Sequence, residues 1–411
     1  MSTRTVQPVA VPLGPAALGV LPALREALNG SGPVLLPHAP GEPPGDLRPP
    51  APEEDDADDP TVAVLSTSGS TGAAKGALLS ASALLASASA GHDRLGGPGR
   101  WLLALPAHHV AGLMILVRSL VSGTRPVVLD LGGGFTPGGF HAAADLLTGP
   151  RRYTALVPTQ LVRLLEAGGP AVAALAAFDA VLVGGAATPG PLLARARAAG
   201  VRVVTTYGMS ETCGGCVYDG VPLDGVRVAV EPDGAAGGRI LLGGPVLARG
   251  YRGGDPAGAF RTGPDGARWF RTDDRGILTW AAHEGQGCPG GAPDRPRLVV
   301  TGRVDDVIVT GGLKVEPAVV EAALLRLPAL AEAVVVGVAD EEWGQRVVAA
   351  LVPAEGHGTP DTAAIRAHVS AAVGAHAAPR QVLVLRRLPL RGPGKPDRGE
   401  VARLAALDGA N

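Results

Sequence analysis

Residues 61–76, TVAVLSTSGSTGAAKG, constrain the fold more than any other part of the 411-residue sequence. Residues 62–65, VAVL, form a short apolar run that is rich in β-branched side chains, which is typical of a buried strand. A turn rich in hydroxyl groups and glycine follows, and residues 77–90 then have the composition of a helix that ends at Gly91. The order strand, loop, helix predicts a loop whose backbone can approach phosphate oxygens closely.

Side chains and glycines of this loop supply the donors that a phosphate group needs. Lys75 lies between Ala74 and Gly76, whereas a Walker loop has Gly directly before its lysine and Ser or Thr directly after it, so we predict a different phosphate loop. A Gly/Ser linker is the alternative, and the flanking strand and helix argue against it. The candidate phosphate ligands are Thr67, Ser68, Gly69, Ser70, Thr71, Gly72 and Lys75.

Composition bounds the class of protein. The length and the 46% of hydrophobic residues predict two or three domains with sizeable cores. Lys and Arg number 36 against 38 Asp and Glu, so no overall field attracts nucleic acid or anionic lipid, and phosphate binding must be local. No apolar run approaches the length of a membrane span. Three cysteines fit a reducing cytoplasm, and the single C-x-x-C pair, Cys213 and Cys216, favours neither a metal site nor a redox pair.

Apolar runs alternate with helical stretches from residue 61 to about 300. This pattern predicts an α/β domain in which a parallel or mixed sheet is covered by helices. A helix over 15–28 and a strand over 34–36 precede it, and we expect the acidic, proline-rich residues 37–60 to form a mobile surface connection. The candidate strands are 62–65, 101–105, 127–131, 155–157, 180–183 and 201–205.

The pattern changes towards the C-terminus. Residues 226–251 have short strands and glycine turns, which predicts a small β subdomain continuing through 269–276, and 283–296 lack periodicity and predict a loop. A hairpin of 298–301 and 307–309 is expected next. A small α+β domain follows, with helices over 317–327 and 360–373 and strands over 333–338, 346–352 and 381–385. Thr359 is the expected cap of the second helix, and Pro360 is its expected first residue. We therefore predict an N-terminal domain over 1–304 and a mobile C-terminal domain over 305–411.

A second stretch, TTYGMSETCGGC from Thr205, directly follows a predicted strand, at the edge where open α/β sheets bind ligands. Tyr207 offers an aromatic face to a purine, and Gly208 leaves room for it. Ser210 offers a hydroxyl group to a phosphate, and Glu211 a hard oxygen ligand to Mg²⁺. An ordinary turn with a capping Ser-Glu pair is the alternative.

Three later segments carry charged residues in turns. Asp274 in FRTDDRG can accept hydrogen bonds from two vicinal hydroxyl groups. TGRVDDVIVTGGLKVEP, from Thr301, places a charged turn and a Gly-Gly hairpin at the boundary to the small domain, where hinges occur. Lys395 lies in a Pro/Gly loop, from which an ammonium group can reach across a cleft. Each segment alone is equally typical of an exposed turn.

Five of these motifs, in order from Thr67 to Lys395, resemble those of the acyl-adenylate-forming superfamily, which includes acyl-CoA synthetases, adenylation domains and luciferases. TSGSTGAAKG resembles its phosphate loop, with Ala74 where proline is usual. YGMSE resembles its YGxTE motif, with Ser210 for threonine. FRTDDRG resembles its TGD element, with Asp273 in place of the usual glycine. TGRVDDVIVTGGLKVEP resembles its hinge segment, and PLRGPGKPDRGEV resembles its terminal loop.

The resemblance implies a role for each matched residue. Asp274 accepts the ribose hydroxyls, Arg303 contacts the nucleotide and Asp305 is the hinge of the small domain. Lys395 is the adenylation lysine and Glu211 the Mg²⁺ ligand. The segment that lines the adenine and acyl pocket is Gly184, Gly185 and Ala186. The backbone that pantetheine passes is that of Gly311 and Gly312.

One stretch narrows the family further. LPAHHVAGLMILVRSL resembles the corresponding stretch of the o-succinylbenzoate–CoA ligases of menaquinone synthesis, and the segment after Tyr207 looks like their actinobacterial versions. By this resemblance His109 borders the acyl and CoA channel, and Met209 belongs to the acid-binding residues. Arg118 is available for the second carboxylate of the acid, which guanidinium binds well. A surface arginine on a helix and a packed histidine are the alternative.

The expected fold is α/β, with a large N-terminal domain of helix-covered mixed or parallel sheets, shortened at its N-terminus, a small β subdomain, and a small mobile α+β domain. The activity that the resemblance implies is that of an o-succinylbenzoate–CoA ligase, an acid–thiol ligase that uses ATP, Mg²⁺ and CoA and proceeds through an acyl-adenylate. The first alternative is a CoA ligase or carrier-loading enzyme for another aryl or fatty acid. The second alternative is a degenerate family member that binds nucleotide without catalysing a reaction. We expect a cytoplasmic protein without nucleic-acid partners or membrane insertion, and a homodimer is left open.

Overall fold

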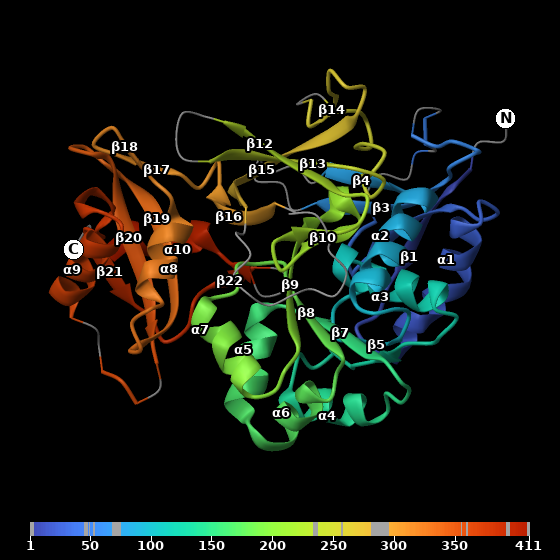
Figure 1. The fold of residues 1–411 in the computed structure, drawn as a ribbon, viewed down its shortest axis with the longest axis horizontal. Helices are drawn as coiled ribbons and strands as arrows, with labels where there is room; N and C mark the ends of the chain where they lie inside the picture. The colour runs from blue at the N-terminus through green and yellow to red at the C-terminus, as the bar shows by residue number, and fades with distance from the viewer. Residues whose placement is uncertain are drawn as a thin grey trace.

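Four sheets and a two-stranded ribbon contain the described strands. The computed structural model describes residues 4–44, 48, 50–51, 54–67, 75–232, 237–255, 258–280, 296–354, 356–358, 361–391 and 395–408. Figure 1 shows a larger part, coloured blue to yellow, beside a smaller part coloured orange to red that contains the fourth sheet. This arrangement confirms the predicted fold class. No helix in the described ranges is long and apolar enough to cross a membrane.

The first sheet holds the two strands that flank the candidate phosphate loop. β1 (Val6–Ala10), β2 (Val34–His38) and β3 (Thr61–Thr67) run parallel, and β4 (Lys75–Ser80) pairs antiparallel with β3. The prediction of a helix from residue 77 is therefore wrong at its start. Ser80 caps α2 (Ala81–Arg94), because its hydroxyl group accepts a hydrogen bond from the Ala83 amide, so the helix begins only at Ala81.

The second sheet has the strand order β11-β10-β9-β8-β7-β5-β6. Its strands from β5 to β9 are parallel, and β10 and β11 extend it antiparallel. The bounds are β5 (Arg100–Leu103), β6 (Val127–Val128), β7 (Arg152–Leu156), β8 (Ala180–Val183), β9 (Val203–Met209), β10 (Gly214–Tyr218) and β11 (Val221–Pro222). β9 thus runs beyond the predicted end at 205 and includes Tyr207, whereas β6 is shorter than predicted.

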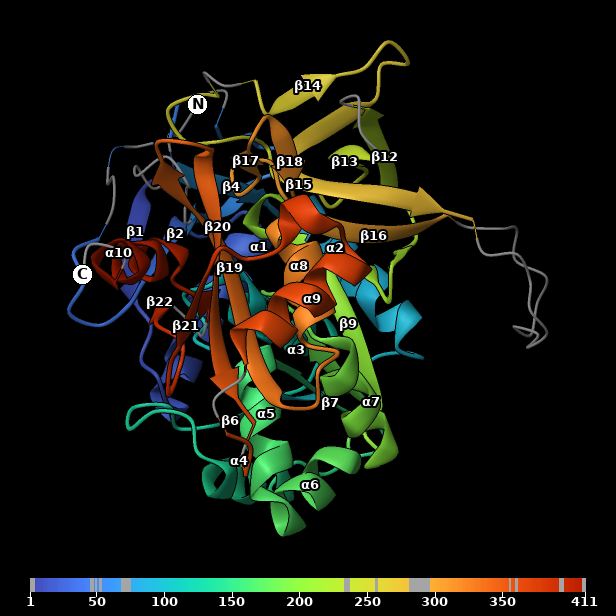
Figure 2. The ribbon, with the colours of Figure 1, turned by 90° about the vertical axis from the view of Figure 1, so that its left-hand side faces the viewer.

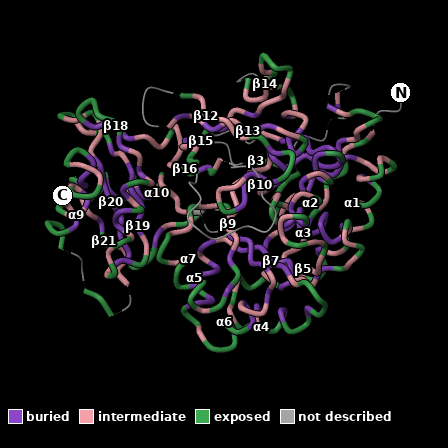
Figure 3. Tube along the Cα trace, viewed as in Figure 1, coloured by how far each residue is buried: buried purple, intermediate pink, exposed green. Residues whose placement is uncertain are grey.

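Alternate residues of these parallel strands enter different cores. On β5, Trp101 and Leu103 belong to a core shared with α1, α2 and α3, whereas Leu102 belongs to a second core under α4 to α7. Figures 1 and 2 show the green helices of the second group on the opposite side of the sheet from α2 and α3. Figure 3 shows the buried strands between them. The helices are α1 (Leu21–Leu28), α3 (Val110–Val121), α4 (Pro137–Asp145), α5 (Pro158–Ala167), α6 (Gly169–Ala176) and α7 (Gly190–Ala198).

The third sheet is antiparallel and forms the predicted β subdomain. Its order is β12-β13-β15-β14, with β16 pairing β15. The predicted hairpin of 298–301 and 307–309 is wrong, because β16 belongs to this sheet and β17 to the next. The predicted loop over 283–296 lies almost wholly outside the described residues. The bounds are β12 (Arg227–Pro232), β13 (Gly238–Gly243), β14 (Phe260–Thr262), β15 (Arg268–Thr279) and β16 (Arg297–Arg303).

The fourth sheet carries the small α+β part. Its order is β18-β17-β20-β19, with β21 parallel to β20, and apolar cores cover both faces. α8 and α9 pack on one face, and α10, which the sequence pattern did not reveal, packs on the other. The bounds are β17 (Ile308–Thr310), β18 (Leu313–Val315), α8 (Pro317–Leu324), β19 (Leu330–Asp340), β20 (Gly344–Pro353), α9 (Thr362–Ala372), β21 (Gln381–Val384) and α10 (Arg398–Asp408).

Two local expectations need correction. The side chain of Asp361 caps α9 by accepting from the Ala363 amide, and Thr359 and Pro360 lie outside the described residues. In the segment 37–60, which was predicted to be mobile, Glu54 is buried and accepts a hydrogen bond from the Gly253 amide. A buried carboxylate with a backbone donor fixes that part of the chain to the rest of the molecule.

Candidate active site

The end of β9 brings a tyrosine against a carboxylate of the third sheet. The Tyr207 hydroxyl donates a hydrogen bond to Oδ2 of Asp274 at 2.8 Å. Asp274 on β15 faces Arg303 on β16 in the antiparallel register, and its Oδ1 lies 3.5 Å from the guanidinium. The structure therefore brings together three residues that the sequence motifs proposed for nucleotide binding, from segments 67 and 29 residues apart.

Burial dominates the electrostatics of this group. The Asp274 side chain is only 16% exposed, and desolvation raises the pKa of its carboxyl, opposed by the Tyr207 hydroxyl and the Arg303 charge. The pKa of Tyr207 is raised well above its usual value by burial and by Asp274, so the phenol remains a donor. A carboxylate held in this way can accept hydrogen bonds from two neighbouring hydroxyl groups, as a ribose presents them.

Arg303 is surrounded by carboxylates. It forms a bidentate pair with Asp305, at 2.9 and 3.1 Å, and lies 3.7 Å from Asp273. Asp273 also pairs with Arg239 at 3.2 Å. Asp273 thus adds a negative charge beside the candidate nucleotide site. Asp305, the predicted hinge, is tied to Arg303, and its neighbour Asp306 lies 3.2 Å from Arg398 of α10.

A second tyrosine–carboxylate pair lies directly after β9. Glu211, in the 3₁₀ turn η2 (Ser210–Thr212), is 7% exposed, and its Oε1 accepts a hydrogen bond from the Tyr251 hydroxyl at 2.7 Å. Nζ of Lys75, at the start of β4, lies 5.0 Å from the centroid of the Tyr251 ring. Burial raises the pKa of Glu211, and Tyr251 and Lys75 oppose that shift. Among the described residues Glu211 has no ion-pair partner within 4.0 Å.

This second group fits a divalent cation. A buried carboxylate without an ion pair within 4.0 Å is unfavourable even with the Lys75 charge acting on it, and a hard cation beside it offsets that cost. The Tyr251 hydroxyl donates to one of the two carboxylate oxygens of Glu211. Sequence reasoning missed Tyr251. The signal lay in ARGYRGG, where one of the chain's four tyrosines stands in a glycine-rich segment after an apolar run.

Glycines near β8 and β9 are required by close approach of the backbone. A Cβ at Gly208 would lie 2.1 Å from the Gly214 carbonyl oxygen, and one at Gly184 would lie 2.2 Å from Thr206 Oγ1. Gly185 adopts a φ of +81°, which favours glycine. Ala186 follows after this turn, and Met209 ends β9, and both are half-buried. Gly208 and Met209 lie on β9, which is paired on both sides, with β8 and β10.

The candidate phosphate loop connects two paired strands. Thr67 ends β3 and pairs with Lys75 at the start of β4, so the two ends of the loop lie side by side. Ser68, Gly69, Ser70, Thr71 and Gly72 lie outside the described residues. Through Lys75 the loop ends beside Tyr251 and Glu211.

His109 and Arg118 occupy opposite ends of α3. His109 is exposed at the N-terminal cap, and its ring lies 4.4 Å from that of His108. Arg118 is 3% exposed, donates to the Tyr218 hydroxyl at 3.2 Å and lies 5.2 Å from the Trp101 ring. It has no carboxylate partner among the described residues, and its Nε has no hydrogen-bond partner there. The structure thus encloses Arg118 and exposes His109, which reverses the alternative of a surface arginine and a packed histidine.

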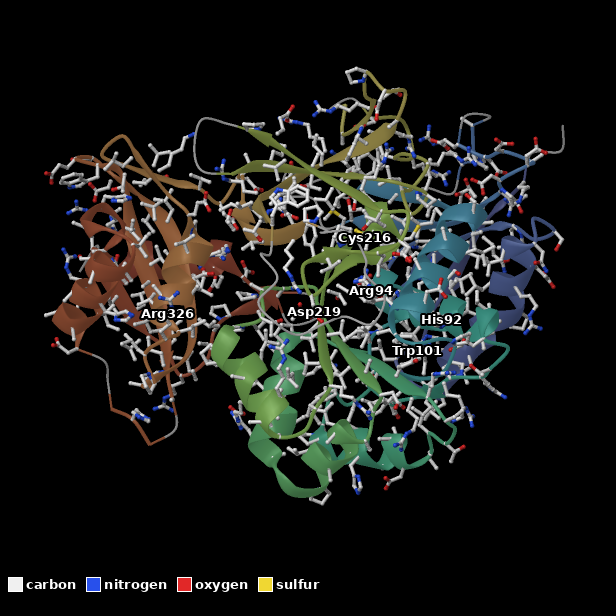
Figure 4. All side chains as sticks on the ribbon, viewed as in Figure 1. His92, Arg94, Trp101, Cys216, Asp219 and Arg326 are labelled. Atoms are coloured by element: carbon white, nitrogen blue, oxygen red, sulfur yellow. The ribbon has the colours of Figure 1, made fainter. Side chains whose placement is uncertain are left out.

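Trp101, with its neighbour His92, lies beside α2 and α3 in Figure 4. The Trp101 indole donates to Nε2 of His92 at 3.4 Å. Burial and the nearby Arg118 charge lower the pKa of His92 to about 4. The interior around Arg118 therefore contains one buried cation and a neutral histidine.

The remaining predicted residues lie in the small part. Gly311 and Gly312, with φ of +56° and +77°, form the turn between β17 and β18. A Cβ at Gly311 would lie 2.8 Å from the Trp343 ring. Lys395 stands in the strand β23 (Lys395–Pro396), which pairs with β22 (Leu390–Arg391). The backbone of Lys395 is thus paired with that of Arg391, and residues 392–394 between them lie outside the described residues.

The cysteine pair is part of the core. Cys213 and Cys216 are buried and not disulfide-bonded, and Figure 4 places Cys216 on β10 in the interior. Burial raises the pKa of Cys213, and it raises the pKa of Cys216 to about 12, so both remain neutral thiols. No group of three or more metal-ligating side chains occurs in the part of the chain that the structure describes.

Comparison with known proteins agrees with this geometry. The family model for AMP-binding enzymes matches residues 19–252, and the model for the C-terminal domain of AMP-binding enzymes matches residues 319–395. The Mycobacterium tuberculosis (strain H37Rv) protein named "Probable 2-succinylbenzoate–CoA ligase" is 48% identical over 395 residues, which cover 96% of this chain and 97% of that protein. The 2-succinylbenzoate–CoA ligase of Geobacillus kaustophilus is 32% identical over 83% of this chain and 69% of its own length.

Two solved structures extend the comparison. o-Succinylbenzoate CoA synthetase (MenE) from Bacillus subtilis, in complex with the acyl-adenylate intermediate OSB-AMP, matches with a TM-score of 0.68 and 26% identity over 92% of this chain and 80% of that chain. The same enzyme in complex with ATP and magnesium ion matches with a TM-score of 0.66 and 28% identity over 83% of this chain and 70% of that chain.

Proposed function

The chain belongs to the AMP-binding enzyme family, and we propose that it is an ATP-dependent o-succinylbenzoate–CoA ligase of menaquinone synthesis. The observation that carries this proposal is the presence of two tyrosine–carboxylate pairs, Tyr207 with Asp274 and Tyr251 with Glu211. One member of each pair lies in the five residues from Tyr207 to Glu211. One pair suits the hydroxyl groups of a ribose, and the other suits a cation beside phosphates. The near full-length similarity to the M. tuberculosis protein supports the choice of acid.

In the first half-reaction, a carboxylate oxygen of the acid attacks the α-phosphorus of ATP, forming an acyl-adenylate and releasing pyrophosphate. Asp274 accepts the ribose hydroxyls, Tyr207 orients Asp274, and Arg303 contacts the nucleotide. The loop from Thr67 to Lys75 binds the β- and γ-phosphates, and Ser210 donates to a phosphate oxygen. Mg²⁺, held by Glu211, neutralises charge on the phosphates when bound.

Lys395 is the proposed catalytic lysine of this step. An ammonium group near both the acid and the α-phosphate stabilises the charge that develops as the new bond forms. In the second half-reaction the CoA thiol attacks the acyl carbon, and AMP leaves. We propose that residues 305–411 turn about Asp305 between the two steps, and that pantetheine passes the turn at Gly311 and Gly312. Adenine binding by Gly184, Gly185 and Ala186 is proposed on the same basis.

The acid-binding residues are proposed from α3 and the end of β9. His109 borders the channel, and Met209 contributes to the acid pocket. For Arg118 we propose an interaction with the second carboxylate, and the supporting observation is that this buried guanidinium has no carboxylate partner among the described residues.

Pyrophosphate release with a panel of acids tests the function. With ATP and Mg²⁺ we expect o-succinylbenzoate to support release and, with CoA present, to give a thioester. Lys395→Ala should lower adenylation by on the order of 100- to 1000-fold. Activity with other acids alone would contradict the choice of acid, and transfer to a carrier protein but not to CoA would favour the carrier-loading alternative.

Arg118→Gln tests the acid site separately. If Arg118 binds the second carboxylate, the variant should raise KM for o-succinylbenzoate by roughly tenfold or more and leave KM for ATP unchanged. A variant that melts at a lower temperature but keeps its KM for the acid would show that Arg118 only supports the interior around Trp101 and Tyr218.

A further inference from the structure

We propose that Tyr251 is a positioning residue for the metal site, because its hydroxyl fixes the Glu211 carboxylate in the orientation in which it binds the divalent cation of the nucleotide. This inference rests on the proposed binding of Mg²⁺ and ATP, and it does not depend on the identity of the acid. Tyr251 does not contact the cation itself. It acts through one carboxylate oxygen and leaves the other to the ligand.

The geometry singles out the hydroxyl group. Tyr251 is 7% exposed and donates to Glu211 Oε1 at 2.7 Å across 40 residues of sequence. Burial together with Glu211 raises the pKa of Tyr251, so the phenol keeps its proton and remains a donor. Glu211 has no ion-pair partner within 4.0 Å among the described residues, so the hydroxyl of Tyr251 is the side-chain group that orients it there.

Several contacts fix the tyrosine ring. Phe260 packs against it edge-on, with ring centroids 5.3 Å apart. The backbone of Tyr251 also forms an isolated antiparallel β-bridge with Ala77 of β4. Lys75 Nζ lies over the ring at 5.0 Å. A rigid ring gives the hydroxyl a fixed direction, which is what orients a metal-binding carboxylate most effectively. Tyr251 therefore contacts both Lys75, at the end of the phosphate loop, and Glu211, the proposed metal ligand.

Tyr251→Phe separates the two contributions, because it keeps the ring and removes only the hydroxyl. The measurement is the affinity of the full chain for Mn²⁺ in the presence of α,β-methylene-ATP and without any acid, with electron paramagnetic resonance used to detect bound Mn²⁺. We expect the variant to bind Mn²⁺ more weakly by roughly 10- to 100-fold, which is the usual effect of removing a hydrogen-bond partner of a metal ligand. Adenylation should recover towards the wild-type rate at high Mg²⁺.

Tyr153→Phe is the matched control. The Tyr153 hydroxyl donates to the carbonyl groups of Leu95 and Gly97 and lies in the core beside Trp101. This variant also loses buried tyrosine hydrogen bonds, and we expect its Mn²⁺ affinity to equal that of the wild type. A general loss of packing would affect both variants alike.

A double-mutant cycle with Glu211→Asp decides whether Tyr251 acts through Glu211. The shorter carboxylate keeps its charge but loses the reach to the hydroxyl, so Tyr251→Phe should have little further effect in that background. Equal Mn²⁺ affinity in wild type and Tyr251→Phe, or full additivity in the cycle, would overturn the inference. Absence of Mn²⁺ and nucleotide binding in the wild type would overturn the proposed function as well. Glu211→Asp alone tests the pair if Tyr251→Phe does not fold.

Discussion

The two tyrosine–carboxylate pairs differ in what surrounds the carboxylate and not in the pair itself. The hydroxyl-to-oxygen distances are 2.8 Å for Tyr207 and Asp274 and 2.7 Å for Tyr251 and Glu211. Burial raises the pKa of both carboxyls. Asp274, however, has Arg303 beside it, whereas Glu211 has no ion-pair partner among the described residues. A carboxylate that the protein pairs closely with a cation suits neutral hydroxyl groups, whereas Glu211, on which the Lys75 charge acts without a direct ion pair, suits a bound cation.

Substituting each carboxylate by its amide should give the largest effects and separate the two roles. Glu211→Gln removes the charge for the cation, so we expect kcat/KM for Mg²⁺·ATP to fall by on the order of 100-fold or more. Asp274→Asn should mainly raise KM for ATP, by roughly tenfold, because it loses hydrogen bonds to a charged acceptor. Initial rates of pyrophosphate release at varied ATP and Mg²⁺ distinguish the two. Changes in the same parameter for both variants would contradict the comparison.

A third buried charge, Arg118, contrasts with both pairs because no described carboxylate balances it. Its neighbour His92 has a pKa lowered from 6.5 to about 4, by burial first and by Arg118 second. Between these two pH values the unfolded chain binds more protons than the folded one. The free energy of unfolding should therefore fall as the pH drops from 6.5 towards 4, by up to about 3 kcal/mol.

His92→Gln should remove this component, since glutamine does not titrate. Chemical denaturation of both proteins across that pH range is the measurement. A wild-type stability that stays constant between pH 6.5 and 4, or the same pH dependence in both proteins, would show that His92 titrates normally.

The sequence motifs located the chemistry but not the partners that tune it. Tyr207, Glu211, Asp274 and Arg303 could be proposed because each stands in a short recognisable stretch. Tyr251 could not, because its contact with Glu211 spans 40 residues and joins a glycine-rich segment to a 3₁₀ turn. The segment ARGYRGG draws attention to the tyrosine, but it does not indicate which residue 40 positions away the hydroxyl will contact.

Local composition also gave the wrong prediction where long-range packing determines the secondary structure or the burial of a residue. Residues 77–80 have a helix-forming composition, yet they form part of β4, since pairing with β3 buries Leu78 and Leu79 and Ser80 caps the next helix. Arg118 could not be placed from sequence for a related reason. An arginine among apolar residues of a helix is usually expected at the surface, and here Tyr218 and Trp101 hold it inside.

Tyr207→Phe should have an intermediate effect and acts on the Asp274 pair alone. The Tyr207 hydroxyl opposes the rise that burial causes in the pKa of Asp274, so its loss should raise that pKa further. Because ribose hydroxyls need the ionised carboxylate, the acid limb of kcat/KM for ATP should move to higher pH, and affinity for ATP at neutral pH should fall by up to about tenfold. The pH profile is the measurement, with Tyr153→Phe as control. An unchanged acid limb would show that Tyr207 does not tune Asp274.

Asp273→Gly should have the smallest effect, although it restores the residue that the family usually has. The Asp273 side chain is 58% exposed, and its pairs with Arg239 and Arg303 are accessible to water and salt. We expect kcat/KM for ATP to change less than about threefold and the free energy of unfolding by less than about 1 kcal/mol. Asp274 and Asp305 still hold Arg303 in the variant, at 3.5 and 2.9 Å in the parent structure. If Asp273→Gly raised KM for ATP as strongly as Asp274→Asn, the exposed Asp273 carboxylate would be needed to balance the Arg303 charge at the site. The comparison of Asp274 with Glu211 would then have to count Asp273 among the groups that set the charge around Asp274.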